Sequence, residues 1–187
     1  MFDEIAEKLT LSGAVGVLPT DTVYGLVARA SDQQAVQRLY DLKLREGKPG
    51  TIIAANIDQL TELGLKARYL KAVEQFWPGA VSVIIPCGPE LAYLHEGKFS
   101  LAVRIPDNPE LLNLLTKTGP LLTSSANHPA EPTATNLHEA QAYFNGNVDF
   151  YVDGGDLSDH KPSTIIRIVD DAIEIIREGA VKIQENE

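Results

Sequence analysis

Short apolar runs alternate with segments of helical periodicity along the whole chain, and this alternation limits the fold more than any other feature. An apolar run between turn residues is typical of a buried strand, whereas apolar residues spaced three and four apart indicate an amphipathic helix. Strands are predicted at residues 15–18, 51–55, 81–86, 101–105, 121–124, 150–153, 163–169 and 173–177. Helices are predicted at residues 2–9, 35–42, 57–64, 67–76, 109–115 and 137–144. This interleaving predicts an α/β fold, in which a twisted sheet of mixed parallel and antiparallel strands is flanked by helices.

Two of the predicted helices begin with recognisable capping signals. Ser31 with Gln34 resembles a capping box, and Asp107 with Pro109 resembles the cap and first turn of a later helix. Two long polar loops, at 125–135 and 154–162, interrupt the regular pattern. Loops of this length inside a compact domain are usually functional or mobile, so both are candidates for parts of a site.

The length of 187 residues fits one domain, so we expect residues 1–187 to form a single unit. The formal net charge of −10 argues against general affinity for nucleic acid, although a local basic pocket remains compatible with it. A single cysteine, Cys87, excludes an internal disulfide. The first ten residues contain acids and no long apolar run, and no segment approaches the roughly 20 apolar residues of a membrane span. We therefore expect a cytoplasmic protein without a signal peptide or a membrane partner.

The segment VGVLPTDTVYGL, at residues 15–26, joins a predicted strand to a polar turn. Pro19 has no N–H group to donate and is expected to end the strand ladder. The residues that follow carry polar side chains, with hydroxyl groups on Thr20, Thr22 and Tyr24 and a carboxylate on Asp21. Polar groups just beyond the C-terminal end of a strand suit a small polar ligand in an open α/β sheet. An ordinary turn, in which the threonines satisfy their own backbone, explains the same residues.

Three cations, Lys43, Arg45 and Lys48, lie between a predicted helix and a predicted buried strand. Gly47 and Pro49 end the helix there, so the three side chains can converge from its unwinding end. Because arginine binds anions through a bidentate fork and lysine as a point charge, the segment predicts an anion site. The alternative is compensation of the helix dipole, worth about 0.3–1 kcal/mol, which explains one cation better than three.

A further cation, Arg104, lies inside the predicted apolar strand LAVRI. A buried arginine needs an anionic partner, so Arg104 either forms a structural salt bridge or holds a carboxylate ligand. Small hydroxyl and amide groups follow another strand, at 123–127, and can hold phosphate oxygens without charge. The four histidines are scattered, so we expect no metal site built from protein side chains.

Seven motifs occur in a fixed order: PTDTVYGL at 19–26, Lys43-x-Arg45, WPG at 77–79, SLAVRIP at 100–106, SAN at 125–127, PSTI at 162–165 and Ile176-Arg177. Together they resemble the YrdC/TsaC family, and the resemblance spans about residues 13–179. Each motif alone is weak, but the KxR and SxN pairs with PTDTVYGL are quite specific. Members of this family are threonylcarbamoyl-AMP synthases, so the resemblance implies a YrdC-like fold with a basic ligand cavity.

The implied reaction is that of an adenylate-forming nucleotidyltransferase. The family condenses L-threonine, bicarbonate and ATP, with accompanying Mg²⁺, into threonylcarbamoyl-AMP and pyrophosphate. The product serves the N6-threonylcarbamoyladenosine modification of tRNA, which partner transferase proteins complete. Matching motif positions place threonine at Thr22, Arg104, Thr123 and Ser163. They place ATP at Lys43, Arg45, Lys48, Ser100, Ser125, Asn127, Thr133 and Arg177, with Lys43 and Arg45 as the catalytic groups.

The sequence departs from the usual family pattern in three places. His128-Pro129-Ala130 follows the SAN motif where many members have Ser-Gly. Glu46 and Glu178 follow the predicted phosphate-binding arginines where proline is common, and each adds negative charge there. We also expect no counterpart of the additional C-terminal domain that some longer members carry.

Two other functions fit the same residues. A family paralogue would keep the fold and nucleotide pocket but use another acyl acceptor. An RNA-binding module would use the basic pocket for RNA, but the acidic balance of the chain allows at most weak RNA binding.

Overall fold

The computed structural model describes residues 2–44, 47–170 and 172–183 of the protein. Its helices are α1 Phe2–Thr10, α2 Gln33–Lys43, α3 Ile57–Leu63, α4 Ala67–Lys71, α5 Ala92–His95, α6 Pro109–Thr118 and α7 Leu137–Phe144, with short 3₁₀ turns η1 Glu74–Phe76 and η2 Pro89–Leu91. Its strands are β1 Val15–Pro19, β2 Tyr24–Arg29, β3 Thr51–Ile53, β4 Val81–Pro86, β5 Ser100–Arg104, β6 Leu121–Ser125, β7 Phe150–Tyr151, β8 Thr164–Val169 and β9 Ala172–Arg177.

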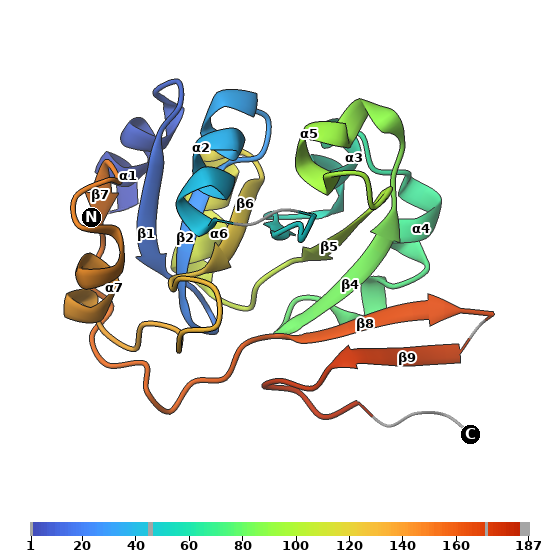
Figure 1. Ribbon diagram of the computed structural model, residues 1–187. Coiled ribbons are helices and arrows are strands. Elements are labelled where there is room, and N and C mark those ends of the chain that lie inside the picture. Colours follow the sequence, from blue (N-terminus) through green and yellow to red (C-terminus); the bar gives the residue numbers. More distant parts are fainter. Residues whose placement is uncertain (1, 45–46, 171, 184–187) are drawn as a thin grey trace.

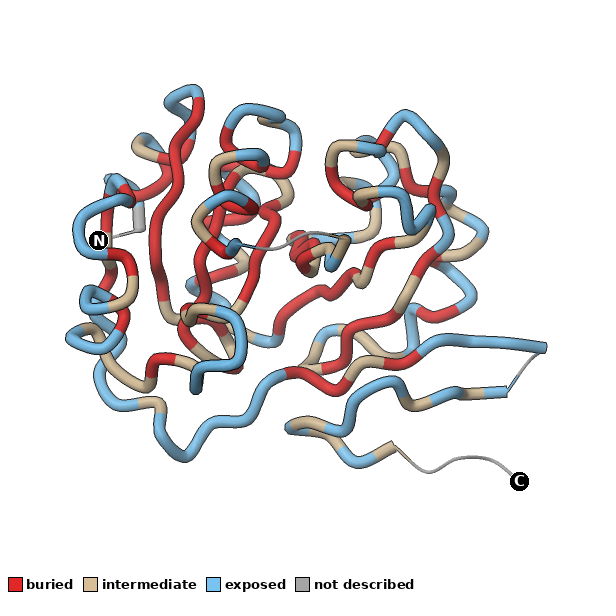
Figure 2. Tube along the Cα trace, in the orientation of Figure 1, coloured by how far each residue is buried: buried red, intermediate tan, exposed pale blue. Residues whose placement is uncertain are grey.

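The strands of the described residues form one twisted sheet in the order β7-β1-β2-β6-β3-β5-β4-β8-β9 (Figure 1). The neighbours β1 and β7, β3 and β5, and β4 and β8 run parallel, and the other neighbouring pairs run antiparallel. The predicted α/β fold with a mixed sheet and flanking helices is therefore confirmed. The middle strands are largely buried, whereas much of the β8–β9 hairpin is exposed (Figure 2).

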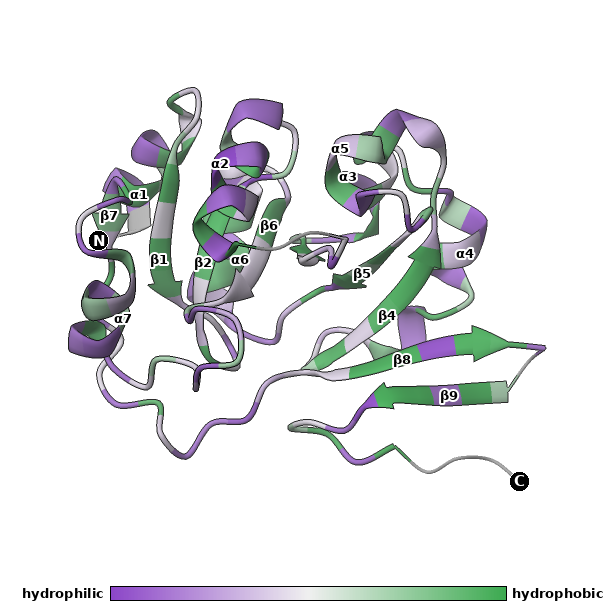
Figure 3. Ribbon diagram, in the orientation of Figure 1, coloured by the Kyte–Doolittle hydropathy of each residue, from purple (hydrophilic) through white to green (hydrophobic). Residues whose placement is uncertain are grey.

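One face of the sheet carries an apolar core beneath α2 and α5. Side chains alternate between the two faces of a strand, so Leu26, Ile52 and Val103 point to the same side. They belong to one buried cluster with Leu39 of α2 and Leu94 of α5. The central strands are predominantly hydrophobic in Figure 3, while α2 displays hydrophilic residues on its outward side.

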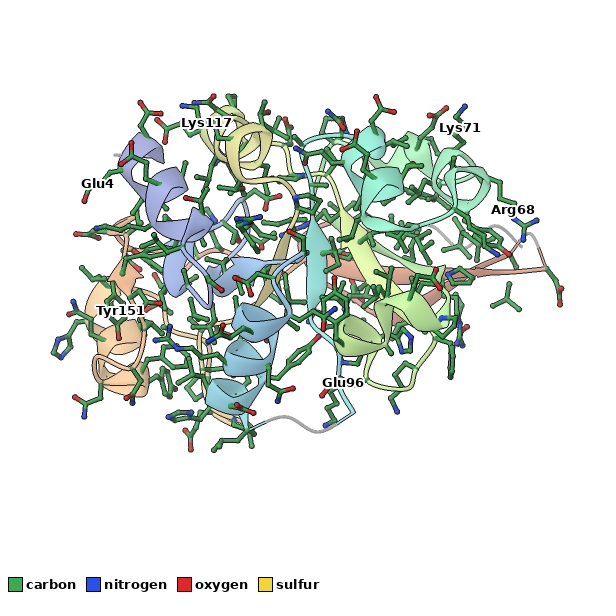
Figure 4. The ribbon with its side chains drawn as sticks, turned by 90° about the horizontal axis from the view of Figure 1, so that it is seen from above. Glu4, Arg68, Lys71, Glu96, Lys117 and Tyr151 are labelled. Carbon is green, nitrogen blue, oxygen red and sulfur yellow. The ribbon has the colours of Figure 1, made fainter. Side chains whose placement is uncertain are left out.

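The opposite face is apolar over only part of its area. Val27, Ile53 and Leu121 cluster there with Leu9 of α1 and Leu114 of α6. The charged side chains on the outer sides of these two helices, such as Glu4 and Lys117, point away from the sheet (Figure 4). Beyond the area that α1 and α6 cover, the same face becomes polar, and this change positions the site described below.

The sequence pattern does not predict β2, because Tyr24 and Gly25 resemble part of the preceding turn. In the structure Tyr24 pairs with Pro19, so β1 and β2 form a hairpin around a four-residue loop. The Thr20 hydroxyl closes this loop, since it donates to the Val23 carbonyl at 2.7 Å and accepts from the Val23 N–H at 3.2 Å. The hairpin therefore uses Thr20 for its own backbone, as the ordinary-turn interpretation expects.

Both predicted helix caps are wrong by one residue. Asp32, not Ser31, caps α2, because its extended backbone lets its carboxylate accept from the Ala35 N–H at 3.0 Å. Asn108, not Asp107, caps α6 in the same way. The predicted helix at 67–76 is divided into α4 and η1, and the short helix α5 was not predicted.

Candidate active site

A cavity of about 190 Å³ opens on the polar part of the second sheet face. It is formed by the β1–β2 loop and by ends of β2, β3, β5, β6, β8 and β9. Six residues predicted from the sequence line it: Thr22, Arg104, Thr123, Ser125, Ser163 and Arg177. They come from positions up to 155 residues apart in the sequence, between Thr22 and Arg177, so the fold gathers them.

Strand register explains why several of these groups share one face. Thr51 pairs with Thr123 of β6 and with Ala102 of β5, while Gly25 of β2 pairs with Ser125. Paired residues in adjacent strands project to the same side of a sheet. Arg104, two residues beyond Ala102, therefore faces the same side as the hydroxyl groups of β6.

Glycine makes the close approach of these strands possible at Gly25. A Cβ atom at this position would lie 2.6 Å from the Thr123 Oγ1 and 3.2 Å from the Thr20 Cγ2. Any side chain would therefore displace the Thr123 hydroxyl and enter the cavity. The glycine that the PTDTVYGL motif supplies keeps this wall open.

The guanidinium of Arg104 is almost completely buried, with 3% of its side-chain surface exposed. Its Nη2 lies 3.2 Å from the Asp21 Oδ1, and its Nη1 donates to the Asp21 Oδ2 at 3.4 Å and to the Thr22 Oγ1 at 3.3 Å. Burial raises the pKa of Asp21, opposed by the charge of Arg104, and burial lowers the pKa of Arg104 against the charge of Asp21. Of the two alternatives that the sequence allows for Arg104, the structural salt bridge is therefore present. Arg104 also lines the cavity, so the ligand alternative stays a prediction.

The second cavity arginine, Arg177, joins the end of β9 to the start of β8. Its Nη2 donates to the Ser163 carbonyl at 2.7 Å and lies 3.3 Å from the Ser163 hydroxyl. That hydroxyl is 2.9 Å from the hydroxyl of Ser82 on β4. These contacts fix Ser163, which is 6% exposed, at the cavity wall.

Lys43 lies beside the cavity rather than among its lining residues in the described part of the chain. Its buried ammonium donates to the backbone carbonyls of Ser125 and Asn127, each at 2.6 Å, and to the Asn127 Oδ1 at 2.8 Å. The Ser125 hydroxyl donates to the same Oδ1 at 2.7 Å. Lys43 thus links the end of α2 to the SAN motif and shapes the loop that carries Ser125 and Asn127.

The other predicted ATP-binding residues are Arg45, Lys48, Ser100 and Thr133. Lys48 is exposed, while Ser100 and Thr133 are half-buried, and the cavity walls in the described residues include none of these three. By extension of the register, Ser100 and Ser125 flank Pro49, which does line the cavity. Arg45, together with Glu46, lies outside the described residues. The assignments of all four residues to ATP stay predictions.

The sequence predicts Asp21 and Tyr24 only as polar groups beside a small ligand, without the contacts that the structure gives them. The buried Tyr24 hydroxyl donates to the Gly155 carbonyl at 2.9 Å and accepts from the Gly154 N–H at 2.8 Å. It thereby ties the 154–162 loop to the β1–β2 hairpin, and this loop leads to Ser163 at the cavity. The available signal was the PTDTVYGL motif itself, which places both residues next to Thr22.

Two other chemical options receive no support from the described residues. They contain no cluster of three or more histidine, cysteine or acidic side chains that could hold a metal ion. Burial raises the pKa of the Cys87 thiol to about 11, so the thiol stays protonated at neutral pH. Among the described residues, there is also no helix with the length and apolarity needed to span a bilayer.

Known proteins share this fold and sequence pattern. The Sua5/YciO/YrdC family model, described as "Telomere recombination", matches residues 8–179. A putative threonylcarbamoyl-AMP synthase of Methanocaldococcus jannaschii is 33% identical over 97% of this chain and 87% of its own length. The threonylcarbamoyl-AMP synthase of Bacillus subtilis is also 33% identical, over 94% of this chain and 53% of its own length.

A solved structure of Pyrococcus abyssi Sua5 complexed with L-threonine superimposes with a TM-score of 0.84 at 29% identity. The match covers 95% of this chain and 54% of that protein, so the chain spans about half the length of this structure and of the Bacillus relative. The family model covers most of the chain, and the Methanocaldococcus relative is matched over most of its length. The chain therefore belongs to the Sua5/YciO/YrdC family.

Proposed function

We propose that this protein is an L-threonylcarbamoyladenylate synthase. The observation that carries the proposal is the convergence of Arg104 and Arg177 with hydroxyl groups on one cavity of an otherwise acidic chain. The names of the relatives, and the threonine bound to one similar structure, support the same substrate class.

The reaction joins three molecules in two bond-forming steps. The amino nitrogen of threonine attacks the carbon of bicarbonate, and loss of water gives a carbamate. A carbamate oxygen then attacks the α-phosphorus of ATP, the bond to the bridging oxygen breaks, and pyrophosphate leaves. Magnesium enters with the ATP as part of the substrate, so the protein need not supply ligands for it.

This chemistry requires alignment and charge neutralisation more than covalent help from the protein. Two anions that repel each other must be held in line, and the charge on the departing pyrophosphate must be compensated. We assign the threonine carboxylate to Arg104, with Thr22, Thr123 and Ser163 completing the amino-acid site. The nucleotide is assigned to Arg177, Ser125 and Asn127, with Lys43, Arg45, Lys48, Ser100 and Thr133 at the phosphates. Lys43 and Arg45 are the proposed catalytic groups, and Lys43 also holds the loop that carries Ser125 and Asn127.

Selection of threonine over valine follows from the hydroxyl groups of the amino-acid site. A site built to hydrogen-bond a substrate hydroxyl can reject an analogue without it by about 10⁴. Thr123 is buried at 7% exposure, so its hydroxyl group would lose its substrate partner when valine replaces threonine.

The proposal is tested with purified protein, MgATP, bicarbonate and L-threonine. We expect threonine- and bicarbonate-dependent release of pyrophosphate, the mass of the adenylate in the product, and little turnover with valine. Arg104→Gln should abolish the activity, whereas Arg167→Gln should retain it, because Arg167 is paired with Glu174 on the exposed hairpin. If no pyrophosphate is released, or if its release does not depend on threonine, this function is excluded. The family paralogue and the RNA-binding module would then be the remaining alternatives.

In the cell, the adenylate is a reactive mixed anhydride that must be consumed by an acyl transfer. We assign this transfer to the tRNA threonylcarbamoyl-transferase proteins, which makes them the downstream partners of a cytoplasmic enzyme.

A further inference from the structure

The cavity arginine is held from behind by a carboxylate that does not itself line the cavity. Arg104 is a cavity residue, whereas Asp21, in the described structure, is not among the lining residues. Both side chains are nearly inaccessible, with 3% and 6% of their surfaces exposed. The ion pair is therefore sealed on the side of Asp21, and Arg104 alone presents its charge to a ligand.

The contacts with Asp21 occupy one edge of the guanidinium. That edge is formed by Nη1 and Nη2, which lie 3.4 Å from the Asp21 Oδ2 and 3.2 Å from the Asp21 Oδ1. The neighbouring edge is formed by Nε and Nη2 and can make a second bidentate contact with a carboxylate. The Nε of Arg104 is buried and has no hydrogen-bond partner among the described residues. An unsatisfied buried donor on a charged group is costly, so this edge is prepared for an acceptor that the folded chain does not provide.

Stability alone gives a weak reason for this arrangement. Desolvation of a buried ion pair offsets much of its attraction, and apolar residues of similar volume are often as stabilising. The opposite pKa shifts of Asp21 and Arg104, both toward the neutral forms, show that burial disfavours each charge here.

We propose that Asp21 is a positioning residue, which holds Arg104 by its Nη1–Nη2 edge so that the Nε–Nη2 edge receives the carboxylate of the amino-acid substrate. This inference rests on the proposed function, because the ligand is the amino acid of that reaction. Asp21 acts through Arg104 and does not touch the ligand. It also balances the arginine charge, so that the subsite selects a carboxylate by geometry and not by net charge.

The test compares binding of L-threonine and of L-threoninol, which has an alcohol in place of the carboxylate, by calorimetry with purified protein. The wild-type chain should prefer threonine by about a hundredfold or more, and Asp21→Asn should reduce this preference at least tenfold, because a displaced group loses much of its effect. The KM for ATP should change less than twofold. Asp149→Asn is the matched control, because it removes a carboxylate from the Arg38 pair outside the cavity.

An unchanged preference in Asp21→Asn, or tighter threonine binding, would overturn the proposal, since the second result would mean that Asp21 competes with the ligand for Arg104. If Asp21→Asn does not fold, Asp21→Glu keeps the charge and moves the carboxylate by one methylene, and the same loss of preference is expected. Preserved preference in the glutamate variant would equally overturn it. Failure of the proposed function is a distinct result: the wild-type protein would bind threonine but form no adenylate.

Discussion

The buried ammonium of Lys43 joins α2 to the loop after β6 through three short hydrogen bonds. Lys43→Met keeps much of the apolar stem and removes the donors, so the Ser125 and Asn127 oxygens lose a charged partner. We expect the free energy of unfolding to fall by about 1.5–3 kcal/mol, measured by urea denaturation. Lys71→Met, at an exposed position of α4, should change it by less than about 0.5 kcal/mol. Equal stability of the two variants would contradict a structural role for Lys43.

Gly25 provides a second test at the scale of single residues. Gly25→Ala places a methyl group 2.6 Å from the Thr123 Oγ1, and we expect a loss of stability of about 1–3 kcal/mol from overpacking. Thr123→Ala removes that oxygen, so the double variant should be more stable than the sum of the single effects predicts. Strictly additive losses in urea denaturation would show that the alanine clashes with something else.

At the scale of elements, the start of α2 depends on Asp32. Its carboxylate accepts from the N–H groups of Ala35 at 3.0 Å and Gly13 at 2.8 Å. Asp32→Ala should therefore lower the free energy of unfolding by about 1 kcal/mol, whereas Ser31→Ala should have little effect. A larger effect from Ser31→Ala would restore the capping box predicted from the sequence.

The same cap makes a prediction about pH. Burial alone would raise the pKa of Asp32, but hydrogen bonds from Ala35 and Gly13 lower it below its ordinary value of 3.8. A lowered pKa in the folded state contributes stability above the unfolded pKa, and this contribution is lost as the pH falls through the folded pKa. The stability difference between wild type and Asp32→Ala should thus be largest near neutral pH and shrink below about pH 4. A difference that grows on acidification would contradict this assignment.

Most elements could be predicted from periodicity, and the failures have local physical reasons. The strand β4 and the helix α7 match their predicted ranges, because turn residues bound a clear apolar run or stripe. The strand β2 could not be predicted, because its first residues resemble a turn. Its conformation depends on pairing with β6, about 100 residues later in the sequence. The capping residues could not be predicted to the residue, because two neighbouring polar residues are both suitable caps and the backbone angles decide between them.

In the candidate site, too, some features could be predicted from the sequence and others could not. Motif resemblance selected six residues that line the cavity, including Arg104 and Arg177. The pairing of Arg104 with Asp21, across 83 residues, depends on how the β1–β2 loop folds over β5. The inward position of Lys43 likewise depends on where α2 ends relative to the SAN loop, which the cation pattern alone does not contain.

At the scale of the whole molecule, charge limits the partners of the protein. The chain carries 26 acidic and 16 basic residues, and two of its arginines, Arg104 and Arg177, line one cavity. We expect no retention of tRNA in filter binding at physiological salt, because nonspecific affinity requires a basic surface that neutralises phosphates. Tight retention that weakens steeply with added salt would instead favour the RNA-binding alternative.

In the proposed function, one cavity holds the amino acid at Arg104 beside the nucleotide. The most direct measurement is a crystal structure of this protein with L-threonine and a non-hydrolysable ATP analogue. We expect the threonine carboxylate within hydrogen-bond distance of the Arg104 Nε, the α-phosphate facing the threonine nitrogen, and Asp21 still at the Nη1–Nη2 edge of the guanidinium. Threonine bound elsewhere, with Arg104 contacting Asp21 alone, would contradict it.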